Sequence, residues 1–90
     1  MASERIRDNL SLIQIEKLIK KLKLQRFKIF KPESDSFIYI EIKNPEKESY
    51  FPLCFIDSCY EDNYSVKLLN SDNFFLRNYN LEIRRICSSL

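Results

Sequence analysis

The spacing of apolar residues changes twice along this chain of 90 residues, and this change limits the fold more than any other feature. Near the amino terminus the apolar residues recur at helical spacing, at Leu12, Ile15, Leu18, Ile19 and Leu22. Ser11 and Gln14 have the spacing of a capping box, in which each side chain accepts a hydrogen bond from a backbone amide of the first turn. We therefore expect a helix over residues 11–24.

From residue 26 onward, apolar residues alternate with polar ones, and aromatic and β-branched residues gather in short runs. This pattern predicts four strands, at residues 26–31, 37–43, 50–56 and 64–69. Proline, asparagine, aspartate and serine separate the runs and supply the turns of a chain that has no glycine. Short turns favour antiparallel neighbours. Pro52 has no amide hydrogen to donate, so the third strand is expected either at an edge or with a bulge near its start.

Helical spacing returns in the last part of the chain, at Phe75, Leu76, Tyr79, Ile83, Ile86, Cys87 and Leu90. Ser71 or Asp72 is the expected cap, and the alternation around Tyr79 leaves a strand as the competing interpretation. The predicted fold is α+β: a small two-layer domain with an antiparallel three- or four-stranded meander, flanked by an N-terminal and a C-terminal helix (α-β-β-β-(β)-α). At this length we expect residues 1–90 to form a single domain.

The chain contains neither glycine nor histidine, which argues against most classes of enzyme. Phosphate-binding loops need glycine where the backbone approaches the phosphate, and histidine is the usual general base and a common zinc ligand. We therefore predict no enzyme activity, no catalytic residue, no cofactor and no metal site. Cys54 and Cys87 fall within apolar patterns, which favours small buried apolar side chains over redox or metal-binding groups. Cys59 as a nucleophile is the one enzymatic alternative, and it lacks a basic partner of the usual type.

Three apolar residues near the amino terminus, Ile6, Leu10 and Ile13, are out of phase with the helix stripe. If the helix extends back to residue 3, these side chains form a second apolar strip that a partner could cover. The alternative is a short separate turn. The amino terminus carries no apolar leader, and no apolar run is long enough to span a membrane. We expect a cytoplasmic protein without a membrane partner.

Charge is distributed unevenly, although the net charge is only +2. Residues 17–31 contain seven basic residues and no acidic one, whereas residues 32–62 contain eight acidic and two basic residues. These opposed blocks could attract a charged partner or pair two copies of the chain head to tail. Alternatively, the lysines are the hydrated face of the helix and the acidic residues lie in hairpin loops.

The predicted strand at residues 37–43 presents two different faces. Its isoleucines share one face, so Phe37 and Tyr39 share the other with Glu41 and Lys43. Neighbouring strands could add to this outward face Lys28, Phe30, Tyr50, Cys54 and Lys67. Such a surface suits a protein partner or stacked nucleobases. In the simplest alternative, the rings only stabilise the sheet.

These features predict a non-enzymatic protein-interaction module: a small adaptor, assembly factor or inhibitor that binds a protein partner, with a homodimer as one form. The expected partner-binding residues are Ile6, Leu10, Ile13, Phe37 and Tyr39. The alternative is a nucleic-acid-binding protein for RNA or single-stranded DNA, with aromatic rings stacked on bases. In that case the phosphates contact Lys17, Lys20, Lys21, Lys23, Arg26 and Lys28.

Overall fold

The computed structural model of this chain describes residues 3–32, 37–43, 48–60, 62–69 and 73–90, without the side chains of residues 59 and 60. Its elements, in chain order, are β1 (Glu4–Leu10), α1 (Leu12–Leu24), β2 (Lys28–Phe30), β3 (Ile38–Lys43), β4 (Tyr50–Tyr60), β5 (Asn63–Leu68), the 3₁₀ turn η1 (Phe74–Leu76) and α2 (Arg77–Ser88).

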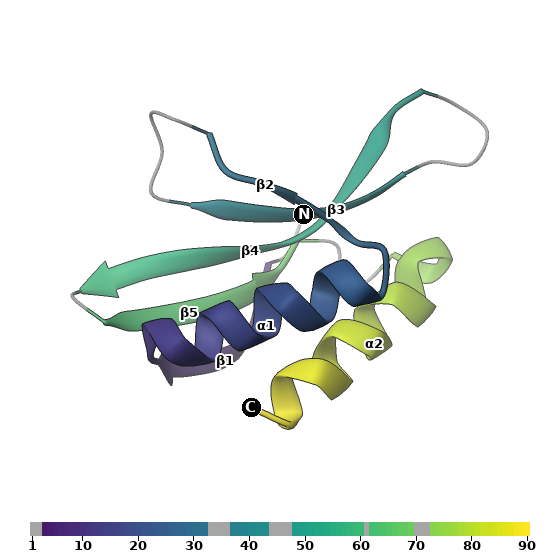
Figure 1. Cartoon of the computed structure of the whole chain (residues 1–90). Coiled ribbons are helices and arrows are strands. Elements are labelled where there is room, and N and C mark those ends of the chain that lie inside the picture. The colour runs from purple at the N-terminus through teal and green to yellow at the C-terminus, as the bar shows by residue number, and fades with distance from the viewer. Residues whose placement is uncertain (1–2, 33–36, 44–47, 61, 70–72) are drawn as a thin grey trace.

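The five strands of the described residues form one antiparallel sheet in the order β1-β5-β4-β3-β2. Strands β2 to β5 follow one another as a meander, and α1 links the two edge strands. Both helices lie on the same face of this sheet (Figure 1). The predicted small α+β domain is therefore confirmed. The four strands β2 to β5 and the two helices fit the predicted meander and its flanking helices, but the predicted element order is wrong, because a fifth strand precedes the first helix.

The amino-terminal segment is a strand, and neither an extension of the helix nor a separate turn. β1 pairs with β5, with Arg5 opposite Lys67 and Leu10 opposite Tyr64. Two register shifts interrupt this pairing, and Asn9 has a φ of 56°, a conformation that asparagine tolerates better than most residues. The backbone amide and carbonyl groups of β1 form hydrogen bonds with β5, whereas in a helix they would bond within the same segment. The conformation of this segment therefore depends on a strand that is distant in the sequence.

The predicted helix and its capping box are confirmed in α1. Ser11 Oγ accepts a hydrogen bond from the Gln14 amide at 3.3 Å, and Gln14 Oε1 accepts one from the Ser11 amide at 2.9 Å. A further bond comes from the β4–β5 turn, where Asp62 Oδ1 accepts from the Leu12 amide at 2.6 Å. Asp62 thus links the start of α1 to the hairpin formed by β4 and β5.

Replacing Asp62 with alanine is expected to lower the free energy of unfolding by about 1–3 kcal/mol. The substitution removes a helix-capping carboxylate, worth about 1 kcal/mol, and places a residue without a polar side chain at a φ of 52°. Urea denaturation measures the change. Asp62→Asn keeps an acceptor oxygen and tolerates this φ, so its loss should be clearly smaller. Equal losses for the two variants would show that the cap is not the cause.

β4 carries a bulge near its start. Ile40 lies opposite Cys54, whereas Glu41 lies opposite Pro52, so Leu53 is the extra residue. Because β4 lies between β5 and β3, the bulge alternative for Pro52 is confirmed and the edge alternative is wrong. Leu53 and Cys54 are both buried. The extra residue reverses the alternation of β4: before the bulge the even-numbered side chains point to one face of the sheet, and after it the odd-numbered ones do.

The carboxyl-terminal segment is a helix, as predicted, and not a strand. η1 leads directly into α2, and Asn73 Oδ1 accepts a hydrogen bond from the Phe75 amide at 2.9 Å. The predicted caps, Ser71 and Asp72, lie outside the described residues. Asn73 therefore supplies a side-chain acceptor at the start of this helical region.

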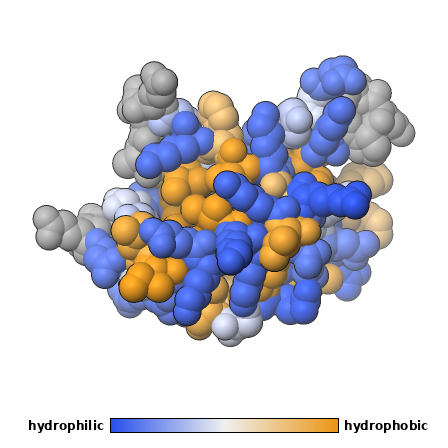
Figure 2. All heavy atoms as spheres, viewed as in Figure 1, coloured by the Kyte–Doolittle hydropathy of each residue, from blue (hydrophilic) through white to orange (hydrophobic). Residues whose placement is uncertain are grey.

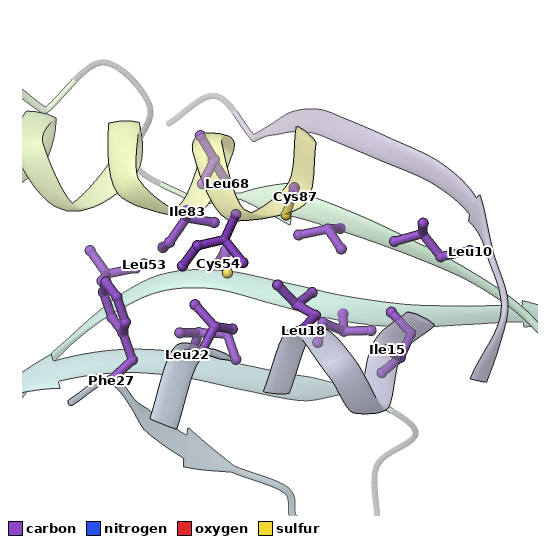
Figure 3. Packing of buried hydrophobic residues seen from close by; sticks show 14 of the residues in the cluster. Leu10, Ile15, Leu18, Leu22, Phe27, Leu53, Cys54, Leu68, Ile83 and Cys87 are labelled. Carbon is purple, nitrogen blue, oxygen red and sulfur yellow. The ribbon is translucent and has the colours of Figure 1, made fainter. Parts of the chain in front are cut away.

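Most of the surface over the two helices is hydrophilic (Figure 2), and the hydrophobic core lies between the helices and the sheet. Figure 3 shows helix and strand side chains meeting there, among them Ile15, Leu18, Leu22, Ile83, Leu53, Cys54 and Leu68. Arg7 also ties α2 to β1, because its Nη1 donates to the carbonyl oxygen of Cys87 at 2.5 Å. Among the described residues, the structure has no helix of sufficient length and apolarity for a membrane crossing.

Candidate binding surface on the open sheet face

A row of directly paired residues crosses the sheet on the face away from the helices. Its members, from β2 to β1, are Phe30, Tyr39, Phe55, Lys67 and Arg5. Their neighbours along the strands, such as Ile40 and Ile56, lie in the core, and successive side chains of a strand point to opposite faces. The row therefore faces away from α1 and α2, which lie together on the other face (Figure 1).

The aromatic rings on this face form one cluster. Phe37 meets Phe55 edge to face, with ring centroids 5.4 Å apart, and meets Tyr39 in a similar geometry at 6.3 Å. The centroids of Tyr39 and Phe55 are also 6.3 Å apart. Each such pair contributes about 0.5–1.5 kcal/mol beyond the burial of its area. All three side chains are half-buried, so the rings are held in place while part of each remains exposed.

Two lysines lie over aromatic rings on the same face. Lys28 Nζ is 4.0 Å from the centroid of the Tyr50 ring, and Lys67 Nζ is 5.7 Å from that of Phe55. Both distances fit cation–π contacts. We use the name aromatic face for the surface formed by Lys28, Phe30, Phe37, Tyr39, Tyr50, Phe55 and Lys67.

The predicted partner-binding residues lie in different places. Phe37 and Tyr39 belong to the aromatic face. Ile6 is half-buried on β1, Leu10 is 0% exposed in the core, and Ile13 is 67% exposed on α1. These last three residues do not form the expected apolar strip, because the segment that carries Ile6 and Leu10 is a strand of the sheet.

The lysine-rich side of α1 and the aromatic face belong to opposite layers of the domain. The exposed lysines of the helix are Lys17, Lys20, Lys21 and Lys23, and Arg26 follows the helix with an exposed side chain. Of the six residues predicted to contact phosphates, Lys28 alone lies on the aromatic face. The structure therefore does not bring the helix lysines and the sheet aromatics together on one face.

Sequence reasoning missed Phe55 and misplaced Phe75. Cys54 was expected to be a small buried residue and was also a candidate for the outward face. The bulge at Leu53 buries it and turns Phe55 outward instead. Phe75 was expected on the buried stripe of the last helix, yet Phe74 and Phe75 are 76% and 89% exposed. The tighter turn of η1 changes the phase of these side chains relative to an α-helix, and no local signal marks that change.

Among residues whose side chains are described, the structure buries the cysteines. Burial raises the pKa of Cys54 well above its ordinary value, and the neighbouring Cys87 adds to the shift. Burial also raises the pKa of Cys87 to about 11, although Arg7 acts in the opposite direction. Neither thiol has the lowered pKa that marks a nucleophile. Within the described part of the chain, no group of three cysteine, aspartate or glutamate residues could hold a metal ion.

The stability of the protein is expected to fall as the pH rises from about 9 to about 11. An unfolded thiol ionises near pH 9.0, whereas Cys87 in the folded protein stays protonated until about 11. The unfolded state therefore binds fewer protons in this range, and about 2–3 kcal/mol of stability is lost. Urea denaturation against pH measures the loss, and Cys87→Ala should show a smaller one. An identical pH dependence in this variant would exclude Cys87 as a source.

Comparison of the chain with protein-family models, curated protein sequences and solved structures found no match. The geometry of the aromatic face therefore carries the functional interpretation.

Proposed function

We propose that this protein is a non-enzymatic protein-interaction module, a small adaptor, assembly factor or inhibitor of the cytoplasm that covers a partner protein with its aromatic face. One observation carries the proposal: both helices lie on one side of the sheet, and the other side presents a packed aromatic cluster. Tyrosine and phenylalanine are enriched in protein interfaces. Rings that already contact one another lose little side-chain entropy on binding.

The arrangement of the rings favours a protein over a nucleic acid. Nucleobases stack on exposed ring faces, but the rings of Phe37, Tyr39 and Phe55 pack against one another. Lys67 and Lys28 lie over the rings of Phe55 and Tyr50. A contiguous apolar patch with charged groups at its rim resembles the centre and rim of a protein interface.

Affinity capture from nuclease-treated extract of the cells that produce the protein tests this proposal. A protein that stays bound at about 0.5 M salt is expected, because apolar contacts tolerate salt whereas exposed ion pairs are screened. Light scattering of the purified chain examines the case in which the partner is a second copy. Retention of nuclease-sensitive material only, with a monomeric chain, would contradict the proposal.

Binding of RNA or single-stranded DNA is the second candidate function. The observation that favours it is the placement of Lys28 and Lys67 over aromatic rings on one face, with Arg5 opposite Lys67 in the same row. Fluorescence anisotropy with mixed short RNA and DNA tests it. Affinity should fall steeply with salt, and Lys67→Gln should flatten the slope of log K against log salt by about one. Salt-insensitive or absent binding would exclude this candidate.

A further inference from the structure

The two helices differ strongly in charge from the rest of the molecule. Residues 12–26 and 73–88, which we name the helix layer, contain eight basic and two acidic residues, a net charge of +6. The rest of the chain contains seven basic and eleven acidic residues, a net charge of −4. Arg84 pairs with Glu4 of β1 at 2.6 Å. The other seven basic side chains of the helix layer are exposed: Lys17, Lys20, Lys21, Lys23, Arg26, Arg77 and Arg85. The small net charge of the protein therefore hides a strongly positive layer that attracts anionic partners.

The most exposed apolar side chains belong to the same layer. Among the described residues, five large apolar side chains are more than half exposed, and all five lie on α1, η1 or α2: Ile13, Leu24, Phe74, Phe75 and Leu81. The rings of the aromatic face are all less exposed than these. A single exposed apolar residue is ordinary. Here, however, the layer that holds most of the positive charge also holds every apolar side chain of this exposure among the described residues.

The exposed residues of the two helices share one outer surface. The ridge of α1 that lies opposite its buried side has residues spaced by four, three and four positions: Ile13, Lys17, Lys20 and Leu24. On α2, Leu81 and Arg85 lie on the side opposite the buried Ile83. The helices lie side by side (Figure 1), and Lys21 Nζ donates to Ser89 Oγ at 3.1 Å between them. Since both pack on one face of the sheet, their outer ridges point away from it together.

This mixture of charge and apolar side chains favours an anionic lipid surface as the occupant. A protein interface gathers its apolar residues in a central patch with charges at the rim, but Lys17 and Lys20 separate Ile13 from Leu24 along α1. A nucleic acid would contact the lysines and offer no apolar environment to these aliphatic side chains. At a membrane surface, anionic headgroups attract lysine and arginine, while apolar side chains beside them enter the boundary of the acyl chains.

We propose that the helix layer binds the surface of a membrane that contains anionic lipids. The exposed lysines and arginines contact the headgroups, and Leu24, Phe75 and Leu81 enter the boundary of the acyl chains. The expectation of no membrane partner rested on the lack of a leader and of a spanning run, and peripheral binding needs neither. The aromatic face lies on the opposite side of the domain and stays free for a protein partner, so this proposal does not rest on the proposed function.

Co-sedimentation of the full chain with phosphatidylcholine vesicles, with and without phosphatidylserine, tests the proposal at about 0.1 M salt. The chain should bind only the vesicles that contain phosphatidylserine. Each lysine near an anionic surface strengthens binding roughly fivefold, so Lys17→Gln/Lys20→Gln should bind about 25-fold more weakly. Lys43→Gln/Lys67→Gln is the matched control, because it removes the same charge from strands β3 and β5. Its binding should stay within about twofold of the original chain.

A second pair of variants tests the entry of apolar side chains. Leu24→Ser/Phe75→Ser should bind at least about tenfold more weakly, because the lost side chains no longer leave water. Both residues are exposed, so circular dichroism should show an unchanged fold. Phe30→Ser, on the aromatic face, should bind as the original chain does.

Four outcomes would overturn the proposal: no binding to the anionic vesicles, equal binding to neutral ones, equal effects of the two lysine pairs, or unchanged binding of Leu24→Ser/Phe75→Ser. Binding of short RNA that depends on Lys17 and Lys20, without vesicle binding, would make a nucleic acid the occupant and would also overturn it. Capture of a partner protein by the aromatic face is measured without vesicles, so failure here is distinguishable from failure of the proposed function.

Discussion

Replacing Leu10 with alanine is expected to lower the free energy of unfolding by about 2–5 kcal/mol. The side chain is 0% exposed and belongs to the core cluster. Shortening it removes buried apolar contacts and leaves a cavity at the junction of β1 and α1. For a chain of this size such a loss is a large part of the total stability. Thermal or urea denaturation monitored by circular dichroism measures it.

Ile13→Ala is the matched control for Leu10→Ala. Both residues were expected to belong to one partner-binding strip, but Ile13 is 67% exposed and its truncation should change the stability by less than about 0.5 kcal/mol. The contrast between the two variants tests the placement of residues 4–10 in the sheet. If both variants have similarly small effects on stability, Leu10 is not buried and the placement of β1 is contradicted.

The double substitution Phe37→Ser/Tyr39→Ser is expected to weaken partner binding by at least about thirtyfold. Aromatic residues at the centre of an interface commonly contribute 2 kcal/mol or more, and a thirtyfold change corresponds to about 2 kcal/mol. The loss of three ring contacts should cost folding stability as well, so circular dichroism must show that the variant is folded. The measurement is the Kd for the captured partner by titration calorimetry.

Phe74→Ser/Phe75→Ser is the matched control for this variant. It removes the same number of aromatic rings from a site that is more exposed than the aromatic face and lies at the start of α2. Binding should stay within about twofold of the original chain. If this control weakens binding and Phe37→Ser/Tyr39→Ser does not, the exposed pair on η1 is the interface and the aromatic face is not.

Local signals in the sequence were sufficient for most of the helices and strands. The capping box of Ser11 and Gln14 marks the start of α1 correctly, and the alternation of isoleucines identifies the buried face of β3. β1 was not predictable in this way, because its hydrogen bonds come from β5, near the other end of the chain. The apolar spacing of Ile6, Leu10 and Ile13 fits a helix as well as an irregular edge strand, so pairing decides between them.

The composition of the aromatic face depended on one bulge. Strict alternation from Tyr50 places Cys54 on the outward face. The extra residue at Leu53 shifts the alternation, so that Phe55 faces outward and Cys54 is buried. Pro52 indicated that a bulge was an alternative, but its position and its effect on the following residues depend on how β4 pairs with β3. The separation of the helix lysines from the aromatic rings was also not predictable from local sequence. It follows from the packing of both helices on one face of the sheet (Figure 1).

Site-specific photocrosslinking tests the role of the aromatic face most directly. A benzophenone amino acid is placed at Phe30 on this face, at Phe75 on η1, or at Lys17 on α1, and the cells that produce the protein are irradiated. The proposal predicts a protein adduct from position 30 that survives nuclease and is absent from positions 17 and 75. A nuclease-sensitive adduct from position 30 or 17, or a protein adduct from position 75 alone, would contradict it.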